Sequence, residues 1–220
     1  MSGRISSSRM RGLLETYLVI GSPNCKAEPI LVLEEAIAGG VTLVQFREKG
    51  EGALHGELMF RLAMQLHEVC RKANIPFIIN DDVELALQIG ADGVHVGQTD
   101  EVADLVRSRI GNMILGVSAY TVVEAEAAIH RGADYLGVGP IFPTASKSDA
   151  KAPQGTNIIC EMRRKGIDLP LVGIGGITTD SACEVIRAEA DGIAVISAIT
   201  QADNVRGAVK KLKQAVRENR

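Results

Sequence analysis

Residues 77–96 read FIINDDVELALQIGADGVHV, and this stretch contains one complete strand–helix–strand unit. The apolar run Phe77–Asn80 predicts a strand, Val83–Ile89 has helical period, and Val94–Val96 predicts a second strand. Gly90 stands where a left-handed residue commonly ends a helix. Both runs are nearly continuous in apolar residues, which is typical of parallel strands that are covered on both faces.

The same alternation continues in both directions along the chain. A short β-branched run is followed by a polar or Gly-rich loop and then by a segment of helical period. The predicted strands are Tyr17–Ile20, Val41–Phe46, Phe77–Asn80, Val94–Val96, Ile114–Ser118, Tyr135–Val138, Leu171–Ile174 and Ile193–Ser197. The predicted helices are Leu31–Ala38, Leu54–Lys72, Val83–Ile89, Glu101–Arg109, Val122–Arg131, Ile158–Lys165, Asp180–Ala188 and Val205–Arg217.

Eight such units predict either a closed (β/α)8 TIM barrel or an open doubly wound sheet. The number of units and the absence of a GxGxxG fingerprint after the first strand favour the barrel. A chain of 220 residues fits one domain, although length alone also allows two small ones. We expect a polar N-terminal lead-in at residues 1–12 and one α/β barrel domain at residues 13–220, with a long, irregular loop at Ile141–Gly155.

The composition excludes several classes of partner. The net charge is −3 and aromatic residues make up 3% of the chain with no Trp, which argues against a nucleic-acid surface. No apolar run approaches the roughly 20 residues that cross a bilayer, and Met1–Arg11 lacks the apolar core of a signal peptide. The four cysteines form no CxxC pair, as expected of a cytoplasmic protein. A homo-oligomer is compatible with the sequence.

Polar residues follow most of the predicted strands, at the end where (β/α)8 barrels carry their chemistry. Seven strand ends supply polar groups or glycines to one mouth. In chain order these residues are Gln45, Arg47, Lys49, Asn80, Asp81, Asp82, Gln98, Asp100, Ser118, Thr144, Ser146, Lys147, Gly175, Gly176 and Ser197.

Asp81 and Asp100 are candidate Mg²⁺ ligands. Mg²⁺ prefers oxygen ligands, keeps several waters and is commonly completed by substrate phosphates. The alternative is that each aspartate caps a helix, Asp81 before Val83–Ile89 and Asp100 before Glu101–Arg109. The residues leave both interpretations open, and Asp82 is the better candidate for a cap than its neighbour.

Three cations on the same rim indicate an anionic substrate. Arg47, Lys49 and Lys147 fit a diphosphate, whose departure requires its charge to be neutralised. Gly175-Gly176 and Ser197 follow the seventh and eighth strands, where barrels of this class commonly bind phosphate. The alternative for the glycine pair is a plain turn.

His95 alternates with Val94 and Val96, so its side chain is expected to point into the barrel. A hydrogen-bonded histidine in the lumen is favoured there over a general base.

At this point the motifs together resemble the thiamine-phosphate synthase family. The resemblance runs from about Tyr17 to Gln201, in order and with closely similar spacing. It is carried by Gln45-Phe46-Arg47-Glu48-Lys49, Asn80-Asp81-Asp82, His95-Val96-Gly97-Gln98 with Asp100, Gly116-Val117-Ser118, Gly139-Pro140-Ile141-Phe142-Pro143-Thr144 and Gly173-Ile174-Gly175-Gly176-Ile177.

The resemblance implies a transferase of thiamine biosynthesis. Its two small-molecule substrates would be 4-amino-2-methyl-5-hydroxymethylpyrimidine diphosphate and 4-methyl-5-(2-phosphoethyl)thiazole or its 2-carboxylate, and its products thiamine phosphate and pyrophosphate, with CO2 from the carboxylate. A dissociative, carbocation-like mechanism would need no protein nucleophile.

The resemblance also assigns residues. Those implied for the pyrimidine diphosphate are Gln45, Phe46, Arg47, Glu48, Lys49, Asn80, Ser118 and Lys147, of which Arg47, Lys49, Ser118 and Lys147 would be catalytic. Those implied for the thiazole phosphate are Thr144, Ala145, Ser146, Gly176, Ile196 and Ser197. Asp81 and Asp100 would bind Mg²⁺.

Two positions depart from the family pattern. Ser146 stands where the family often has Thr and keeps the hydroxyl, whereas Phe142 stands where it often has Tyr and loses a phenolic O–H. The competing functions are a related thiazole tautomerase, which needs no diphosphate site, and a non-catalytic phosphate sensor, which needs no metal ligands. Asn80, Asp81, Asp100 and Lys147 speak against the tautomerase, and the two aspartates speak against the sensor.

Overall fold

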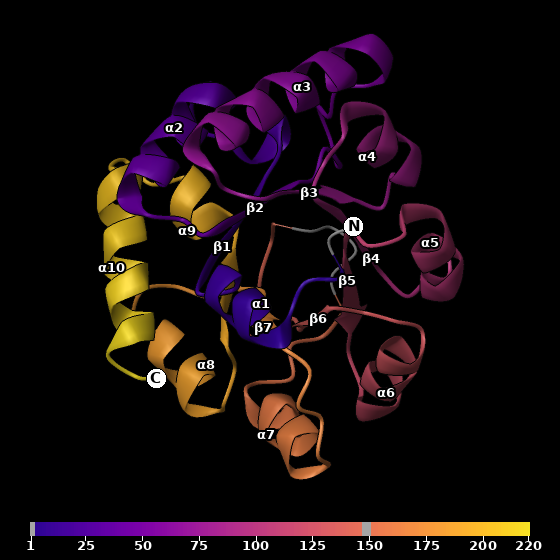
Figure 1. Ribbon diagram of the computed structural model, residues 1–220. Helices are drawn as coiled ribbons and strands as arrows, with labels where there is room; N and C mark the ends of the chain where they lie inside the picture. Colours follow the sequence, from indigo (N-terminus) through magenta and orange to yellow (C-terminus); the bar gives the residue numbers. More distant parts are fainter. Residues whose placement is uncertain (1–2, 147–150) are drawn as a thin grey trace.

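The computed structural model describes residues 3–146 and 151–220 and contains a closed barrel of eight parallel strands. Each strand pairs with the next, and β8 pairs with β1 (Figure 1). The strands are β1 Thr16–Ile20, β2 Leu43–Phe46, β3 Phe77–Asn80, β4 Gly93–Val96, β5 Ile114–Ala119, β6 Tyr135–Val138, β7 Leu171–Ile174 and β8 Gly192–Val195. The prediction of a TIM barrel is confirmed, and the open sheet is excluded.

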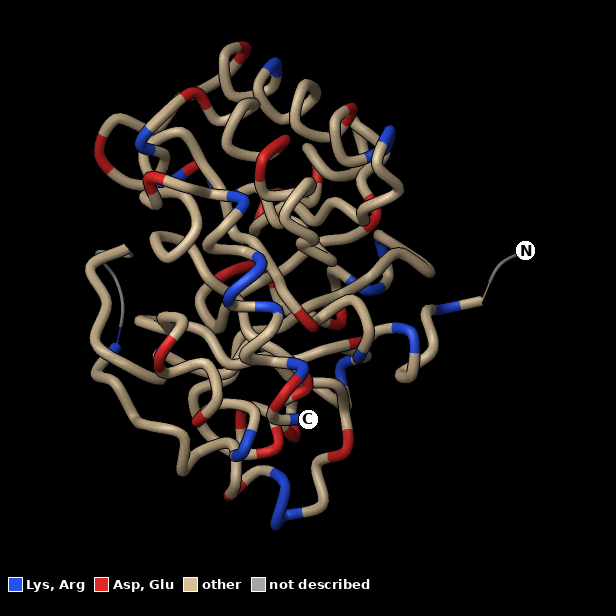
Figure 2. Tube along the Cα trace, turned by 90° about the vertical axis from the view of Figure 1, so that its left-hand side faces the viewer, with Lys and Arg blue, Asp and Glu red and all other residues tan. Residues whose placement is uncertain are grey.

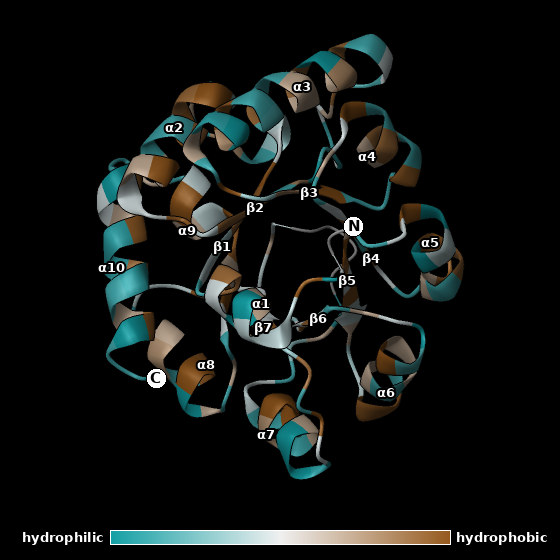
Figure 3. Ribbon diagram, viewed as in Figure 1, coloured by the Kyte–Doolittle hydropathy of each residue, from teal (hydrophilic) through white to brown (hydrophobic). Residues whose placement is uncertain are grey.

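Helices form an outer ring around the strands (Figure 1). They are α2 Pro29–Gly39, α3 Gly56–Ala73, α4 Val83–Ile89, α5 Ala103–Ile110, α6 Val122–His130, α7 Asn157–Arg164, α8 Ala182–Arg187 and α10 Val205–Arg217. Their apolar sides face the barrel and their polar sides face solvent (Figure 3). All eight predicted helices are present, with ends that differ by up to a few residues.

Alternation along each strand divides the core into two layers. In β1, Leu18 and Ile20 pack outward against the helices, whereas Tyr17 belongs to a separate cluster inside the barrel. The inner cluster also contains Leu43, Ile78, Ile114, Tyr135, Val172 and Ala194. Because both faces of every strand are buried, the strands read as apolar runs in the sequence.

Helix α1, Ser7–Leu13, lies across the end of the barrel at which the strands begin (Figure 1). Met10 and Leu14 are fully buried in the inner cluster, so these two side chains close the floor of the barrel. The lead-in that we expected at residues 1–12 therefore contains a packed helix. Its one buried side chain, Met10, is too little to give a helical period in so polar a segment.

Three Ala-Asp turns lead into strands at this same end of the barrel. Asp92, Asp134 and Asp191 each accept a hydrogen bond from the first or second backbone N–H of the preceding strand, at 2.8–2.9 Å. The turns therefore fasten neighbouring strands to each other and stabilise this end of the barrel.

The structure also contains two short elements that periodicity did not predict. These are the 3₁₀ turn η1, Ser22–Asn24, and helix α9, Ser197–Thr200. Ser197, expected at the end of the eighth strand, is the first residue of α9. A short extra helix after the last strand is common in barrels that bind phosphate.

Within residues 3–146 and 151–220, no helix is long and apolar enough to cross a membrane. Charges of both signs are interspersed along the described chain (Figure 2). All four cysteines lie in the described part and are free thiols.

Candidate active site

A cavity of about 360 Å³ opens among the carboxyl ends of the strands. Its lining includes most of the predicted site residues that the structure describes. These are Arg47, Lys49, Asn80, Asp81, Asp100, Ser118, Thr144, Ser146, Gly176, Ile196 and Ser197. Lys147, the remaining predicted cation, lies outside the described residues.

The carboxyl groups of Asp81 and Asp100 both line this cavity and lie close enough to influence each other's ionisation. Lys49 forms an ion pair with Asp81, and the Asn80 amide donates to the same carboxylate at 2.6 Å. Burial, together with the neighbouring Asp100, raises the pKa of Asp81 to about 6. Asp81 also has a left-handed backbone with φ +63°, an unusual conformation for a residue other than glycine, which occurs preferentially at functional sites.

Neither aspartate caps a helix, so the alternative interpretation of these residues is wrong. Asp82 performs that role for α4, because its Oδ1 accepts from the Leu85 N–H at 2.9 Å. Helix α5 begins after Val102, and the Asp100 carboxylate instead accepts from the Gly97 N–H at 2.7 Å.

The carboxylate pair fits a divalent cation. Two like charges held together in a half-buried site require a proton or a cation between them. Within the described residues no cluster of three or more His, Cys, Asp or Glu could hold a metal by itself. A pair of carboxylates that leaves the other positions to water and phosphate matches the coordination habits of Mg²⁺.

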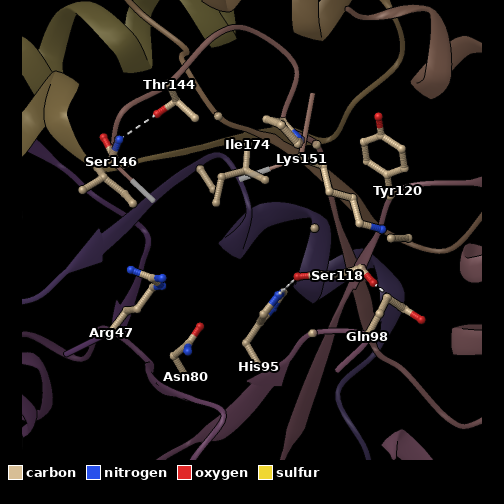
Figure 4. A pocket seen from close by; sticks show the side chains of 18 of the residues that line it. Arg47, Asn80, His95, Gln98, Ser118, Tyr120, Thr144, Ser146, Lys151 and Ile174 are labelled. Atoms are coloured by element: carbon tan, nitrogen blue, oxygen red, sulfur yellow. Dashed lines mark hydrogen bonds between the residues drawn. The ribbon is translucent and has the colours of Figure 1, made fainter. Parts of the chain in front are cut away.

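Two further groups stand on the rim. Arg47 is largely buried, whereas Lys151 is half-exposed and lies over the Tyr120 ring, 4.5 Å from its centre (Figure 4). Lys151 Nζ also lies 3.5 Å from a Glu124 carboxylate oxygen. We did not single out Tyr120 and Lys151 from the sequence, although Tyr120 follows Ser118 by two residues. Lys151 and Tyr120 lie 31 positions apart in the sequence, so no local pattern predicts their contact.

Ser118 lies on the cavity wall beside His95. His95 Nε2 is 2.9 Å from Ser118 Oγ, and the Gln98 amide donates to the Ser118 backbone carbonyl at 2.6 Å (Figure 4). The expectation that His95 points into the barrel as a hydrogen-bonded residue is confirmed.

A group of hydroxyls faces Arg47 and Asn80 from the opposite side of the view in Figure 4. The Ser146 N–H donates to Thr144 Oγ1 at 3.2 Å, and Ser146 Oγ donates to Ser197 Oγ at 3.3 Å. Gly176 lies beside them with φ +65°. A Cβ at this position would collide with the Pro143 carbonyl, so only glycine permits this close approach.

Four predicted residues lie away from the cavity lining. The Gln45 amide points into the lumen and donates to the Tyr17 hydroxyl at 2.5 Å, and Phe46 packs outward against Phe77. The Glu48 carboxylate accepts from the backbone N–H groups of Ser22 and Leu54, both at 2.8 Å, and thereby joins two loops. The fourth residue is Ala145.

Comparisons with known proteins agree with this geometry. The sequence profile described as "Thiamine monophosphate synthase" matches residues 16–199. The chain is 53% identical to "Thiamine-phosphate synthase" of Bacillus velezensis, over 99% of the chain and 97% of that protein. It is 52% identical to the protein of the same name from Bacillus cereus, over 98% of the chain and 99% of that protein.

Solved structures give the same result. A thiamine phosphate pyrophosphorylase from Pyrococcus furiosus superposes with a TM-score of 0.85 at 35% identity, over 96% of this chain and 98% of that one. A structure described as native KDPGal superposes with a TM-score of 0.70 at 15% identity, over 93% of this chain and 95% of that one, a likeness of fold alone.

Proposed function

Because the chain belongs to the thiamine monophosphate synthase family, we propose that its cavity holds two phosphorylated substrates on opposite sides and joins them. The chain is a transferase of thiamine biosynthesis. Its reaction condenses the pyrimidine diphosphate with the thiazole phosphate and releases pyrophosphate.

The pyrimidine diphosphate occupies the side of the cavity that carries the cations. Arg47 offers a planar fork to phosphate oxygens and Lys49 a point charge, while Asn80 and Ser118 supply neutral donors. Lys147 completes this set in the proposal, although it lies outside the described residues. Phe46 and Glu48 would act by holding the strand and its loop in place, since their side chains contact protein groups instead.

Asp81 and Asp100 hold Mg²⁺ in this proposal, supported by the meeting of their carboxyl groups beside the cations. When bound, the ion would neutralise the diphosphate oxygens and so improve the leaving group. Asn80 orients the Asp81 carboxylate by its hydrogen bond, and the Gly97 N–H orients that of Asp100.

The thiazole phosphate occupies the hydroxyl side of the cavity. Thr144, Ser146 and Ser197 supply hydroxyl groups within a few ångströms of one another. Gly176 and Ile196 line the cavity together with these hydroxyl groups, and Ala145 lies between Thr144 and Ser146 in the sequence.

We propose that bond breaking precedes bond making. The C–O bond to the diphosphate breaks with its electron pair leaving on pyrophosphate, and the thiazole nitrogen then forms the new C–N bond. The chain contributes position, charge neutralisation and exclusion of water from the cationic pyrimidine fragment. Ser118 and His95 contact each other and both line the cavity, which supports a role for them in orienting the pyrimidine.

One observation carries the proposal: a carboxylate pair with a lysine and a cluster of hydroxyls share one cavity. The test is pyrophosphate release from the purified chain with both substrates and Mg²⁺, compared with mixtures lacking one substrate or containing EDTA. We expect release in the complete mixture alone. Isomerisation of the thiazole without pyrophosphate would instead indicate a tautomerase, and binding without turnover would indicate a sensor.

We also propose that the enzyme acts in the cytoplasm, supported by its four free thiols. A homo-oligomer is compatible with the exposed side chains of Leu58, Leu87 and Leu105, which lie on the neighbouring helices α3, α4 and α5. Sedimentation of the purified chain measures its association state.

A further inference from the structure

Five side chains from five strands form an unbroken chain of hydrogen bonds in the barrel lumen. The chain begins at Gln45 Nε2, which lies 2.5 Å from the Tyr17 hydroxyl, and continues over 2.7 Å to the Tyr135 hydroxyl. It then runs over 2.9 Å to His95 Nδ1 and ends with the 2.9 Å contact between His95 Nε2 and Ser118 Oγ. Ser118 lines the cavity, whereas Tyr17, Gln45 and Tyr135 lie beneath it.

The first residue gives this chain a direction. The Gln45 amide nitrogen can only donate, so the Tyr17 oxygen accepts from it. Each phenol carries one proton, because burial raises the pKa of both Tyr17 and Tyr135 far above neutrality. An arrangement that uses each phenol proton once within the chain has Tyr17 donating to Tyr135 and Tyr135 donating to His95 Nδ1.

The same logic sets the state of the last two residues. Since His95 Nδ1 accepts a hydrogen bond from Tyr135 in this arrangement, Nδ1 carries no proton and the ring proton lies on Nε2. His95 then donates to Ser118 Oγ. The hydroxyl proton of Ser118 is not used by His95 and is available to an acceptor in the cavity.

Ring packing and two glycines accommodate these side chains in the lumen. The Tyr17 and Tyr135 rings pack edge to face, with centroids 5.9 Å apart, and the His95 ring lies 5.4 Å from that of Tyr135. A Cβ at Gly116 would collide with Tyr135 and with His95 Nδ1, and one at Gly137 would lie 3.0 Å from His95 Cε1. The two glycines therefore provide the space in which His95 meets its partners.

We propose that this directed chain makes Ser118 a hydrogen-bond donor to the pyrimidine diphosphate, with His95 as the positioning residue. The proposal rests on the proposed function for the identity of the substrate. In the opposite direction, Ser118 would donate to His95 and present only its lone pairs to the substrate. Gln45, implied as a substrate ligand, contacts the Tyr17 hydroxyl at the far end of the chain.

The kinetic test removes one buried hydroxyl at a time. Tyr135→Phe deletes the donor to His95 Nδ1 without touching the cavity, and we expect kcat to fall about tenfold with little change in KM, the loss of about one hydrogen bond. Tyr17→Phe is the matched control, because it deletes an equally buried hydroxyl but leaves Tyr135 able to donate to His95. A structural role predicts equal losses in the two variants, whereas the positioning role predicts a clearly smaller loss for Tyr17→Phe.

Two further variants separate positioning from packing. His95→Gln retains an amide that can donate to Ser118, and His95→Leu retains only bulk, so we expect the first to recover much of the kcat that the second loses. In a Ser118→Ala background, Tyr135→Phe should have no further effect on kcat, because both changes remove the same interaction. Additive effects, or a Tyr135→Phe enzyme with wild-type kcat, would overturn the proposal.

A spectroscopic measurement tests the direction without any substrate. The ¹⁵N NMR shifts of histidine-labelled protein report which imidazole nitrogen carries the proton, and His95→Gln identifies the signal. We expect an Nε2–H tautomer for His95 in the wild type, and an Nδ1–H tautomer would contradict the proposal. If the wild-type chain releases no pyrophosphate, the proposed function fails, while the tautomer still decides the direction of the chain.

Discussion

Aspartates stand at both ends of the barrel, but their surroundings are opposite in character. At the end where the strands begin, Asp134 accepts from the Leu115 N–H and pairs with Arg4 and Arg107. Asp191 likewise accepts from the Leu171 N–H and pairs with Arg11 and Arg163. Both oxygens of each carboxylate have donors from within the chain.

At the mouth, the carboxyl groups of Asp81 and Asp100 contact each other and draw on Lys49, Asn80 and one backbone N–H. Such a pair does not stabilise the fold, because two carboxylates in a half-buried site oppose each other's ionisation. The carboxylates of the floor therefore stabilise the barrel, whereas those of the mouth fit the proposed role of binding a cation and a substrate.

The largest effect is expected at the floor. Asp134→Ala leaves Arg107 and the Leu115 N–H without their shared acceptor in a buried site, and we expect the free energy of unfolding to fall by about 3–5 kcal/mol. Urea unfolding measures this change. Asp203→Ala, at an exposed ion pair with Lys26, is the control and should be neutral. A similar result for both variants would remove the distinction between buried and exposed aspartates.

The opposite pattern is expected at the mouth. Asp81→Asn removes one charge of the pair, so we expect turnover to fall on the order of 100-fold while the unfolding temperature stays level or rises. Asp82→Asn is the matched control, since asparagine also caps helices and the side chain serves α4. Normal turnover by Asp81→Asn would show that the carboxylate pair has no part in the reaction.

The hydroxyl side of the mouth depends on a glycine. Gly176→Ala brings a Cβ against the Pro143 carbonyl, and we expect KM for the thiazole phosphate to rise about tenfold. Gly166→Ala imposes similar backbone strain, at φ +81°, where nothing lies within 4 Å of the added carbon. Gly166→Ala should lose about 1 kcal/mol of stability from backbone strain and Gly176→Ala more because of the collision, but only Gly176→Ala should change KM. Equal KM values would argue against a phosphate subsite there.

The smallest effect concerns the outer donor of the floor. Arg4 is 42% exposed and joins the N-terminal segment to Asp134, so Arg4→Ala should lower the free energy of unfolding by about 1 kcal/mol without changing kcat. Lys26→Ala is the exposed control and should show no change. Thermal unfolding and steady-state rates of both variants decide this point, and a fall in kcat for Arg4→Ala would link the floor to the reaction.

The sequence predicted the barrel and most of the mouth because both follow from local pattern. Strands that are buried on both faces appear as apolar runs, and the residue after each run must lie at the catalytic end. Arg47, Asp81, Ser118 and Ser197 each follow or end such a run, and all four line one cavity.

What the sequence could not supply is contact between distant segments. Three features depend on tertiary packing: the burial of Met10 beneath the barrel, the position of Lys151 over Tyr120, and the hydrogen bond from Gln45 to Tyr17. Choosing between a cap and a ligand for Asp81 required its backbone conformation and its neighbours, which no spacing encodes.

The most direct test of the division between floor and mouth is the unfolding temperature measured with and without Mg²⁺ and pyrophosphate. A ligand that binds only the folded state raises that temperature. We predict a rise for the wild type and for Asp134→Asn, and little or none for Asp81→Asn. An equal rise in Asp81→Asn, or its loss in Asp134→Asn, would contradict the assignment of the cation to the mouth.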